Sequence, residues 1–200
     1  LNRERELISV YISGHPLDDY SIILTDVCSN HAPDLADISP YKDKDITVGG
    51  IVTSVRTGQT KTGKPYGIVK LEDYDGAGEI ALFGDDWARH SGYFTIGNSL
   101  FITAHVEERH WKPGNYDLRI TKIEFLSDVK ENKIQRITFT LNLDELDDIA
   151  AQDLSTHLQK AGKTELYFNV REPKRSFNVT LRSQTPGIAV TKELVDFVKE

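Results

Sequence analysis

Residues 66–83 of the chain read YGIVKLEDYDGAGEIALF, and this stretch decides the fold. Apolar and polar residues alternate on both sides of Asp75-Gly76, a dipeptide that is typical of a tight hairpin turn. Because successive side chains of a strand point to opposite faces, the alternation predicts one strand over residues 66–72 and another over residues 79–83. Their shared inward face consists of Val69, Leu71, Ile80 and Leu82.

Strand patterns continue on both sides of this hairpin. Residues 46–56 (ITVGGIVTSVR) are rich in β-branched side chains and contain Gly49-Gly50, a pair typical of the bulges and bends of barrel strands. Two further strands are predicted over residues 100–106 and 116–125, and residues 84–93 predict a short helix that begins with two acids. Five strands with a helix between the third and the fourth indicate a five-stranded OB-fold barrel.

The two ends of the chain have different patterns. Residues 1–45 predict two short helices followed by a linker rich in Asp, Pro and Ser. Residues 127–200 predict a strand, an amphipathic helix over residues 146–161, a hairpin, and a final helix capped by Thr191. The expected fold class is mostly β with α+β parts. A helical connector (residues 1–45) precedes the OB-fold domain (46–126), and a small α+β domain (127–200) follows it.

The composition of the chain indicates how its charge is distributed and in which cellular compartment it is expected. The 200 residues carry a net charge of −7, and the acidic excess lies in the first 45 residues, which hold 4 Lys or Arg and 9 Asp or Glu. The predicted barrel is nearly neutral, with 9 basic and 10 acidic residues. The chain contains no Met, which indicates a piece of a longer protein, and its start is too charged for a signal peptide. With one cysteine, Cys28, and no long apolar run, a cytoplasmic protein without disulfides or membrane spans is expected.

Residues that could carry catalysis are better explained as structural. The acidic pairs Asp18-Asp19, Asp85-Asp86 and Asp147-Asp148 each fall near a predicted helix start, where carboxylates cap the helix and match its dipole. The six histidines show no spacing typical of metal ligands, and no glycine-rich phosphate loop precedes a helix. We therefore predict no catalytic residue and no metal site.

The loop between the first two strands is the first candidate binding element. Arg56, Lys61 and Lys64 are three cations with no acid between them, and Gly and Thr residues in the loop favour flexibility. Such cations could neutralise phosphates, while Tyr66 and Phe83 on the outer sheet face could stack on bases. A solvated hairpin loop without a ligand is the alternative interpretation.

The loop between the fourth and fifth strands is the second candidate. Its Arg109, Trp111 and Lys112 combine cations with an aromatic ring that is costly to leave exposed to water. Alternatively, Trp111 folds back over an open barrel end. Glu107 and Glu108 weaken the local positive field, so a modest and salt-sensitive affinity is expected. The predicted DNA-binding residues are Arg56, Lys61, Lys64, Tyr66, Phe83, Arg109, Trp111, Lys112 and Arg119.

Several segments resemble a known family, the alpha subunit of bacterial DNA polymerase III. Residues 6–18 (ELISVYISGHPLD) are similar to the segment that precedes the OB domain in that family. Residues 47–52 (TVGGIV), 60–66 (TKTGKPY) and 71–73 (LED) are similar to the OB domain itself. Residues 138–143 (TFTLNL) more weakly resemble the start of the family's last domain.

This resemblance implies the non-catalytic C-terminal part of a replicative DNA polymerase. In such proteins the OB domain is associated with the single-stranded template, and the last domain contacts the tau subunit of the clamp loader, among other replisome subunits. The aspartates that bind Mg²⁺ for nucleotidyl transfer, and the internal clamp-binding peptide, would lie before Leu1. By resemblance, the parent protein is a DNA-directed DNA polymerase, whereas this region has no enzymatic activity and no cofactor.

Two other kinds of function stay open. The near-neutral barrel is also compatible with a protein–protein scaffold of the replisome, in which other parts of the polymerase cover the OB face. An OB module of an RNA-binding enzyme, such as a tRNA synthetase, is a third possibility, although residues 13–17 (SGHPL) argue against it.

Overall fold

The computed structural model describes residues 15–109, 112–145, 148–172, 174 and 176–199. Backbone proximity divides the chain into two compact units, Leu1–Val129 and Lys130–Glu200. The first predicted helix, around residues 7–12, lies outside the described residues. Within the described part, no helix is both long and apolar enough to cross a membrane.

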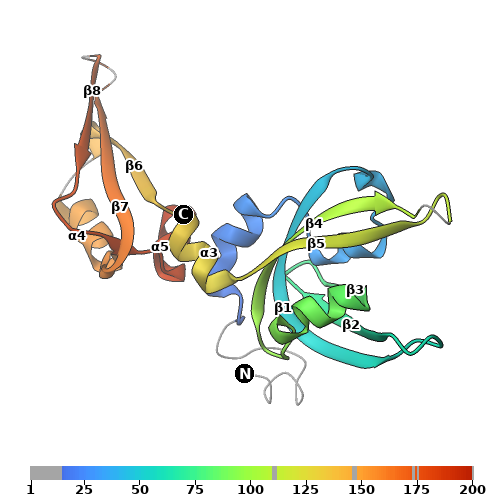
Figure 1. Ribbon diagram of the computed structural model, residues 1–200. Coiled ribbons are helices and arrows are strands. Elements are labelled where there is room, and N and C mark those ends of the chain that lie inside the picture. The colour runs from blue at the N-terminus through green and yellow to red at the C-terminus, as the bar shows by residue number, and fades with distance from the viewer. Residues whose placement is uncertain (1–14, 110–111, 146–147, 173, 175, 200) are drawn as a thin grey trace. The chain divides into compact units, whose positions relative to one another are not determined.

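The first unit is built on a five-stranded antiparallel sheet, which confirms the predicted OB-type barrel and a mostly β fold (Figure 1). The strands are ordered β3-β2-β1-β4-β5, so that β3 and β5 are the two edges of the sheet. Four short helical turns precede the barrel. The elements are η1 (Asp18–Tyr20), η2 (Ile23–Val27), η3 (Ala32–Ala36), η4 (Ser39–Tyr41), β1 (Asp45–Gln59), β2 (Pro65–Glu72), β3 (Ala77–Phe83), α2 (Asp85–His90), η5 (Ser91–Tyr93), β4 (Ser99–Glu108), β5 (Tyr116–Phe125) and α3 (Leu126–Lys133).

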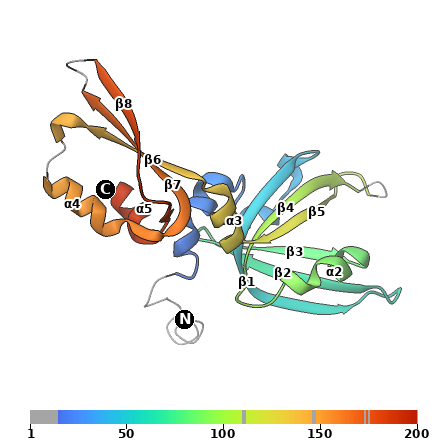
Figure 2. The same ribbon diagram turned by 60° about the vertical axis from the view of Figure 1, so that its left-hand side comes forward.

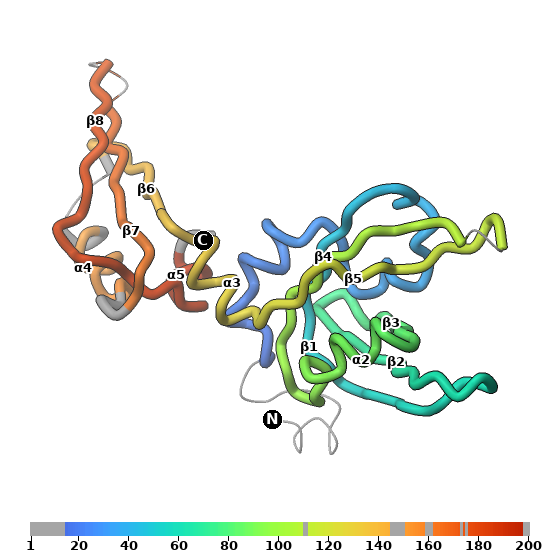
Figure 3. The backbone as a smooth tube through the Cα atoms, in the orientation of Figure 1, coloured from blue at the N-terminus to red at the C-terminus, as the bar shows by residue number. Residues whose placement is uncertain are grey.

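The long strand β1 pairs with two different strands along two parts of its length (Figure 3). Its first part, up to Ile51, pairs with β4, and from Ile51 onward it pairs with β2. The irregularity in the register falls between Val52 and Ser54. The bulge predicted at Gly49-Gly50 is therefore displaced by a few residues, to the point where the strand has exchanged one partner for the other.

The barrel core confirms the predicted inward face of the hairpin. Val69, Leu71, Ile80 and Leu82 are all at most 2% exposed. Trp87 packs helix α2 onto the inward face of β2, where its ring adjoins the barrel core and lies so close over Gly67 that a Cβ there would collide with it. The same ring stacks on Phe94, with ring centroids 6.1 Å apart and planes at 7°. Trp87 thus fixes the helix that follows the last residue of β3.

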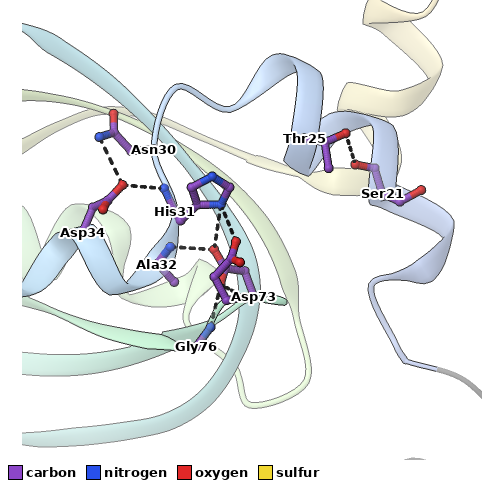
Figure 4. A network of polar contacts seen from close by, with 9 residues as sticks. Ser21, Thr25, Asn30, His31, Ala32, Asp34, Asp73 and Gly76 are labelled. Atoms are coloured by element: carbon purple, nitrogen blue, oxygen red, sulfur yellow. Dashed lines mark hydrogen bonds and ion pairs between the residues drawn. The ribbon is translucent and has the colours of Figure 1, made fainter.

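Residues 28–45, predicted as a linker, are packed against the barrel. Ala32 and Leu35 of η3 belong to the barrel core, and a Cβ at Gly78 of β3 would collide with the Ala32 carbonyl oxygen. The buried carboxylate of Asp73 accepts hydrogen bonds from the backbone N–H of Ala32 at 2.6 Å, Asp75 at 2.9 Å and Gly76 at 3.1 Å. Figure 4 shows how this carboxylate ties η3 to the β2–β3 turn.

The second unit combines a small sheet with two helices, as predicted. Strands β6 and β7 pair in parallel and are joined through α4, while β7 and β8 form an antiparallel hairpin. Buried Phe139, Leu154, Leu166 and Leu194 form its core. Leu194 N donates to Thr191 Oγ1 at 3.3 Å, which confirms the predicted cap of the last helix. The elements are β6 (Arg136–Asn142), η6 (Leu143–Glu145), α4 (Asp148–His157), β7 (Gln159–Glu172), β8 (Phe177–Arg182), β9 (Ile188–Ala189) and α5 (Lys192–Lys199).

The helix predicted over residues 146–161 was too long. Helix α4 ends at His157, and β7 begins at Gln159. The residues in question favour a helix locally, but the short strand β9, which the sequence did not indicate, pairs with them: Gln159 lies opposite Ala189. Tertiary strand pairing has therefore overridden local propensity.

Candidate nucleic-acid interface

The open side of the barrel carries a cleft between its two edge strands. We call it the β3–β5 cleft; it has a volume of about 470 Å³. Phe83 and Leu118 contribute apolar surface to it. Its charged lining consists of Asp86, Glu107, Arg109, Asp117 and Arg119. The β1–β2 loop and the described ends of the β4–β5 loop project from the same side of the barrel in both views (Figures 1 and 2). The cleft therefore lies between the two loops that OB-folds use for binding.

Tyr66 and Phe83 form an aromatic pair beside this cleft. They are direct partners across β2 and β3, and their ring centroids are 5.9 Å apart with planes at 36°. Phe83 is 51% exposed, whereas Tyr66 is half-buried. The structure therefore brings these two predicted residues together and leaves one face of the Phe83 ring available for stacking.

The β1–β2 loop is shorter than the sequence indicated. Strand β1 extends to Gln59, and the remaining turn is closed by hydrogen bonds, including Thr60 N to Lys64 O at 2.8 Å and Lys64 N to Thr60 Oγ1 at 3.0 Å. Lys61 and Lys64 are exposed, and neither has a carboxylate within 4.0 Å among the described residues. Lys64 passes beside Gly84, the residue that follows Phe83. The loop is thus a hydrogen-bonded turn that presents two cations.

Three of the predicted cations are already matched by carboxylates. Arg56 Nη2 lies 2.6 Å from Glu79 Oε1, and Arg119 Nη1 lies 4.0 Å from Glu107 Oε2. Arg109 donates through Nε to Asp117 Oδ1 at 2.7 Å and also through Nη2, and this bond raises the pKa of the Arg109 guanidinium. Lys112, by contrast, is exposed and has no carboxylate partner among the described residues. Trp111 lies outside the described residues.

The base of the β4–β5 loop is fastened by Glu108. Its carboxylate accepts a hydrogen bond from the Lys42 ammonium and another from Gly114 N at 2.7 Å. Both contacts lower the pKa of Glu108, with the Lys42 hydrogen bond as the largest cause. The sequence suggested that Glu108 is a free negative charge, but in the structure its carboxylate is paired and stabilises the loop.

Sequence reasoning missed the acids Asp117 and Asp86 of the cleft. The register of β4 and β5 would have indicated the position of Asp117, because it places Glu107 opposite Asp117 and His105 opposite Arg119. Residues at alternate positions of paired strands share one face, so Asp117 necessarily joins Arg119 on the cleft side. Arg56 does not line the cleft; it lies opposite Ile68, on the same outer face of β1 and β2 as Tyr66.

One group of residues in the described part could hold a metal ion. The ligand atoms of His31, Asp73 and Asp75 lie within 4.8 Å of one another, and His31 Nδ1 is 2.8 Å from Asp75 Oδ2. Because the Asp73 oxygens already accept three backbone hydrogen bonds, the cluster is accounted for by the turn that it stabilises (Figure 4). The sequence did not predict this cluster because His31 is far from Asp73 and Asp75 along the chain.

Comparisons with known proteins agree with this geometry. Residues 46–126 match the family model "OB-fold nucleic acid binding domain", and residues 137–200 match "DNA polymerase III alpha subunit, C-terminal domain". DNA polymerase III subunit alpha of Borreliella burgdorferi is 27% identical over 92% of this chain and 16% of its own length. The Vibrio cholerae subunit is 24% identical over 97% of the chain and 17% of its own length.

Among solved structures, the second OB-fold domain of replication protein A from Methanococcus maripaludis is 12% identical, with a TM-score of 0.28. The match covers 42% of this chain and 85% of that one. The chain spans about one sixth of the length of the curated relatives named above. The chain is therefore similar to the C-terminal part of DNA polymerase III alpha subunits, with a match to an OB-fold nucleic-acid-binding domain followed by a match to that subunit's C-terminal domain.

Proposed function

We propose that the first unit binds single-stranded DNA, without acting on it chemically, as part of a replicative DNA-directed DNA polymerase. The observation that carries this proposal is the half-exposed Phe83 ring in the lining of the β3–β5 cleft, near Lys64, which has no carboxylate partner among the described residues. Aromatic platforms flanked by cations are the usual means by which OB-folds hold single strands, because every base has a face that can stack. In this proposal, the Mg²⁺ ions and the catalytic aspartates belong to other parts of the polymerase.

The ligand follows a simple path in this proposal. Phosphates lie on the exposed lysines of the two loops, which are Lys61, Lys64 and Lys112, and bases stack on Phe83. None of these contacts reads the edge of a base, so the binding is independent of sequence. A template that moves through a polymerase requires such weak, sequence-independent contacts.

Removal of the two loop lysines is expected to flatten the salt dependence of binding. Each phosphate contact on a single strand contributes about 0.7 to the slope of log K against log salt, so Lys61→Ala/Lys64→Ala should reduce the slope by about 1.4. Fluorescence anisotropy of a labelled oligonucleotide, titrated with the full chain at several salt concentrations, measures the slope.

The matched control is Lys122→Ala/Lys163→Ala, which removes two exposed lysines that already have carboxylate partners. An unchanged slope in the loop variant, or no binding by the unaltered chain at high micromolar concentration and low salt, would favour the scaffold interpretation instead. Equal affinity for folded tRNA and for single-stranded DNA would favour an RNA-binding module.

We further propose that the second unit binds a partner protein, namely the tau subunit of the clamp loader, which the family likeness implies. The observation in its favour is an apolar pocket of about 710 Å³ within this unit. Its lining includes Phe139, Leu141, Leu158, Phe168 and Leu181, and Leu181 is 51% exposed. An open apolar pocket of this size suits the side chains of a docked protein segment.

Leu181→Ala is expected to weaken tau binding about tenfold, because burial of a leucine side chain is worth about 1.5–3 kcal/mol and part of it remains in alanine. Isothermal titration of the full chain with tau gives the dissociation constant. Leu143→Ala serves as the control, since Leu143 is 43% exposed in the same unit and does not line the pocket. Equal losses in the two variants, or none in either, would count against this pocket as the docking site.

A further inference from the structure

Both guanidinium groups that line the β3–β5 cleft face a carboxylate on the neighbouring strand. Arg109, which directly follows β4, donates to Asp117 of β5 through Nε and Nη2, with 2.7 Å between Nε and Oδ1. Arg119 of β5 faces Glu107 of β4, with 4.0 Å between Nη1 and Oε2. In the first pair the arginine is on the β4 side and the acid on β5, and in the second pair the arginine is on β5 and the acid on β4. A guanidinium whose fork already binds a carboxylate has fewer donors left for a phosphate.

The charge of the cleft differs from the charge of its rim. Asp86, Glu107 and Asp117 outnumber the two guanidinium groups inside, so the cleft carries a net negative charge. The lysines of the flanking loops have no carboxylate partner among the described residues. Lys64 lies beside Gly84 at the β3 wall of the cleft, and Lys112 N donates to Arg109 O at 3.1 Å. Positive charge is therefore available at the rim and is neutralised inside.

We propose that Asp117, assisted by Glu107, lowers the affinity of the cleft for phosphate by keeping Arg109 and Arg119 in ion pairs; we call this effect the electrostatic brake. In this scheme the cleft admits bases, and only the rim lysines bind phosphate. This inference rests on the proposed binding of single-stranded DNA by the same surface. Asp117 is a positioning residue in this scheme, because it acts through Arg109. The brake holds the affinity low, so that the strand is released readily.

Asp117→Asn in the full chain tests the brake. The variant removes one negative charge and frees the Arg109 fork, while the side chain keeps its size. We expect three- to tenfold tighter binding of a labelled oligonucleotide, the Coulomb effect of one charge about 6 Å away at an effective dielectric constant of about 40–80. We also expect the slope of log K against log salt to become steeper by about 0.7, because Arg109 gains a phosphate.

Three further variants separate the brake from simpler explanations. Arg109→Gln alone leaves Asp117 unpaired in the cleft and should weaken binding, and the double variant Arg109→Gln/Asp117→Asn should return close to the original affinity and slope. Asp26→Asn neutralises an exposed carboxylate of η2 and should change neither quantity. A change in slope distinguishes a new phosphate contact from a general rise in stability, which would leave the slope as it was.

The outcomes for the brake and for the proposed function are distinct. If the unaltered chain binds the oligonucleotide but Asp117→Asn binds with the same or lower affinity, the brake is wrong and the proposed function stands. If neither protein binds, both are wrong. Thermal melting checks the fold of Asp117→Asn; if that variant does not fold, Glu107→Gln makes the same test through Arg119, which is 66% exposed.

Discussion

Phe83→Ala should weaken the binding of single-stranded DNA about five- to 150-fold, which is the range for losing one base stack of about 1–3 kcal/mol. Phe83 lies at the end of the edge strand β3, its ring is 51% exposed, and it borders the β3–β5 cleft. Because the ring is so exposed, its removal costs the fold little, and the loss is expected in binding rather than in stability. Anisotropy titrations with the full chain at low salt measure the change.

A matched control for this experiment is Phe177→Ala. Phe177 belongs to the second unit and is 45% exposed, so this variant removes an equally accessible ring from outside the proposed interface. Its affinity for the oligonucleotide should equal that of the unaltered chain. If Phe83→Ala bound as tightly as Phe177→Ala, the aromatic pair would have no part in the contact, and binding would have to rest on the loop cations alone.

Asp73→Ala should destabilise the first unit by about 2–4 kcal/mol, because it leaves three backbone N–H groups, among them the buried N–H of Ala32, without their acceptor. The carboxylate that would be lost is only 4% exposed and ties η3 to the β2–β3 turn. For a unit of this size, the expected fall in melting temperature is about 8–16 °C. Thermal unfolding followed by circular dichroism measures the fall.

Two variants of the same turn serve as controls. Asp73→Asn keeps an oxygen that can accept from Asp75 N and Gly76 N, so its cost should lie between zero and that of Asp73→Ala. Asp75→Ala removes a carboxylate that is 60% exposed and pairs with His31, and exposed pairs are worth about 0–1 kcal/mol. Similar melting temperatures for Asp73→Ala and Asp75→Ala would show that the buried hydrogen bonds of Asp73 do not hold the turn.

The two largest effects concern opposite ends of the β2–β3 hairpin. Its turn is tied to η3 by Asp73, whereas the other end presents Phe83 at the cleft with Tyr66 beside it. A rigid hairpin fixed at one end positions the aromatic pair at the other without help from a ligand. Stability and binding can therefore be altered separately in this unit, which makes the variants informative.

Much of the barrel could be predicted because its strands are locally encoded. The alternation on both sides of Asp75-Gly76 requires one face of the hairpin to be buried, and Val69 and Leu82 occupy that face in the structure. The segment with η3 could not be predicted as part of the barrel, since its burial depends on the open end of a sheet formed later in the chain. The predicted end of α4 was wrong for a similar reason, because the strand that pairs with Gln159, β9, lies about 30 residues further along the chain.

The types of residue at the candidate interface follow from the sequence alone: two loops with exposed lysines, an aromatic pair on neighbouring strands, and a nearly neutral barrel. The tertiary structure decided which charges are free. It paired Arg56, Arg109 and Arg119 with Glu79, Asp117 and Glu107, and it left Lys61, Lys64 and Lys112 exposed. The physical reason is that local pattern determines which face of a strand a side chain occupies. Whether two charges meet depends on strand register and on the distance across the sheet.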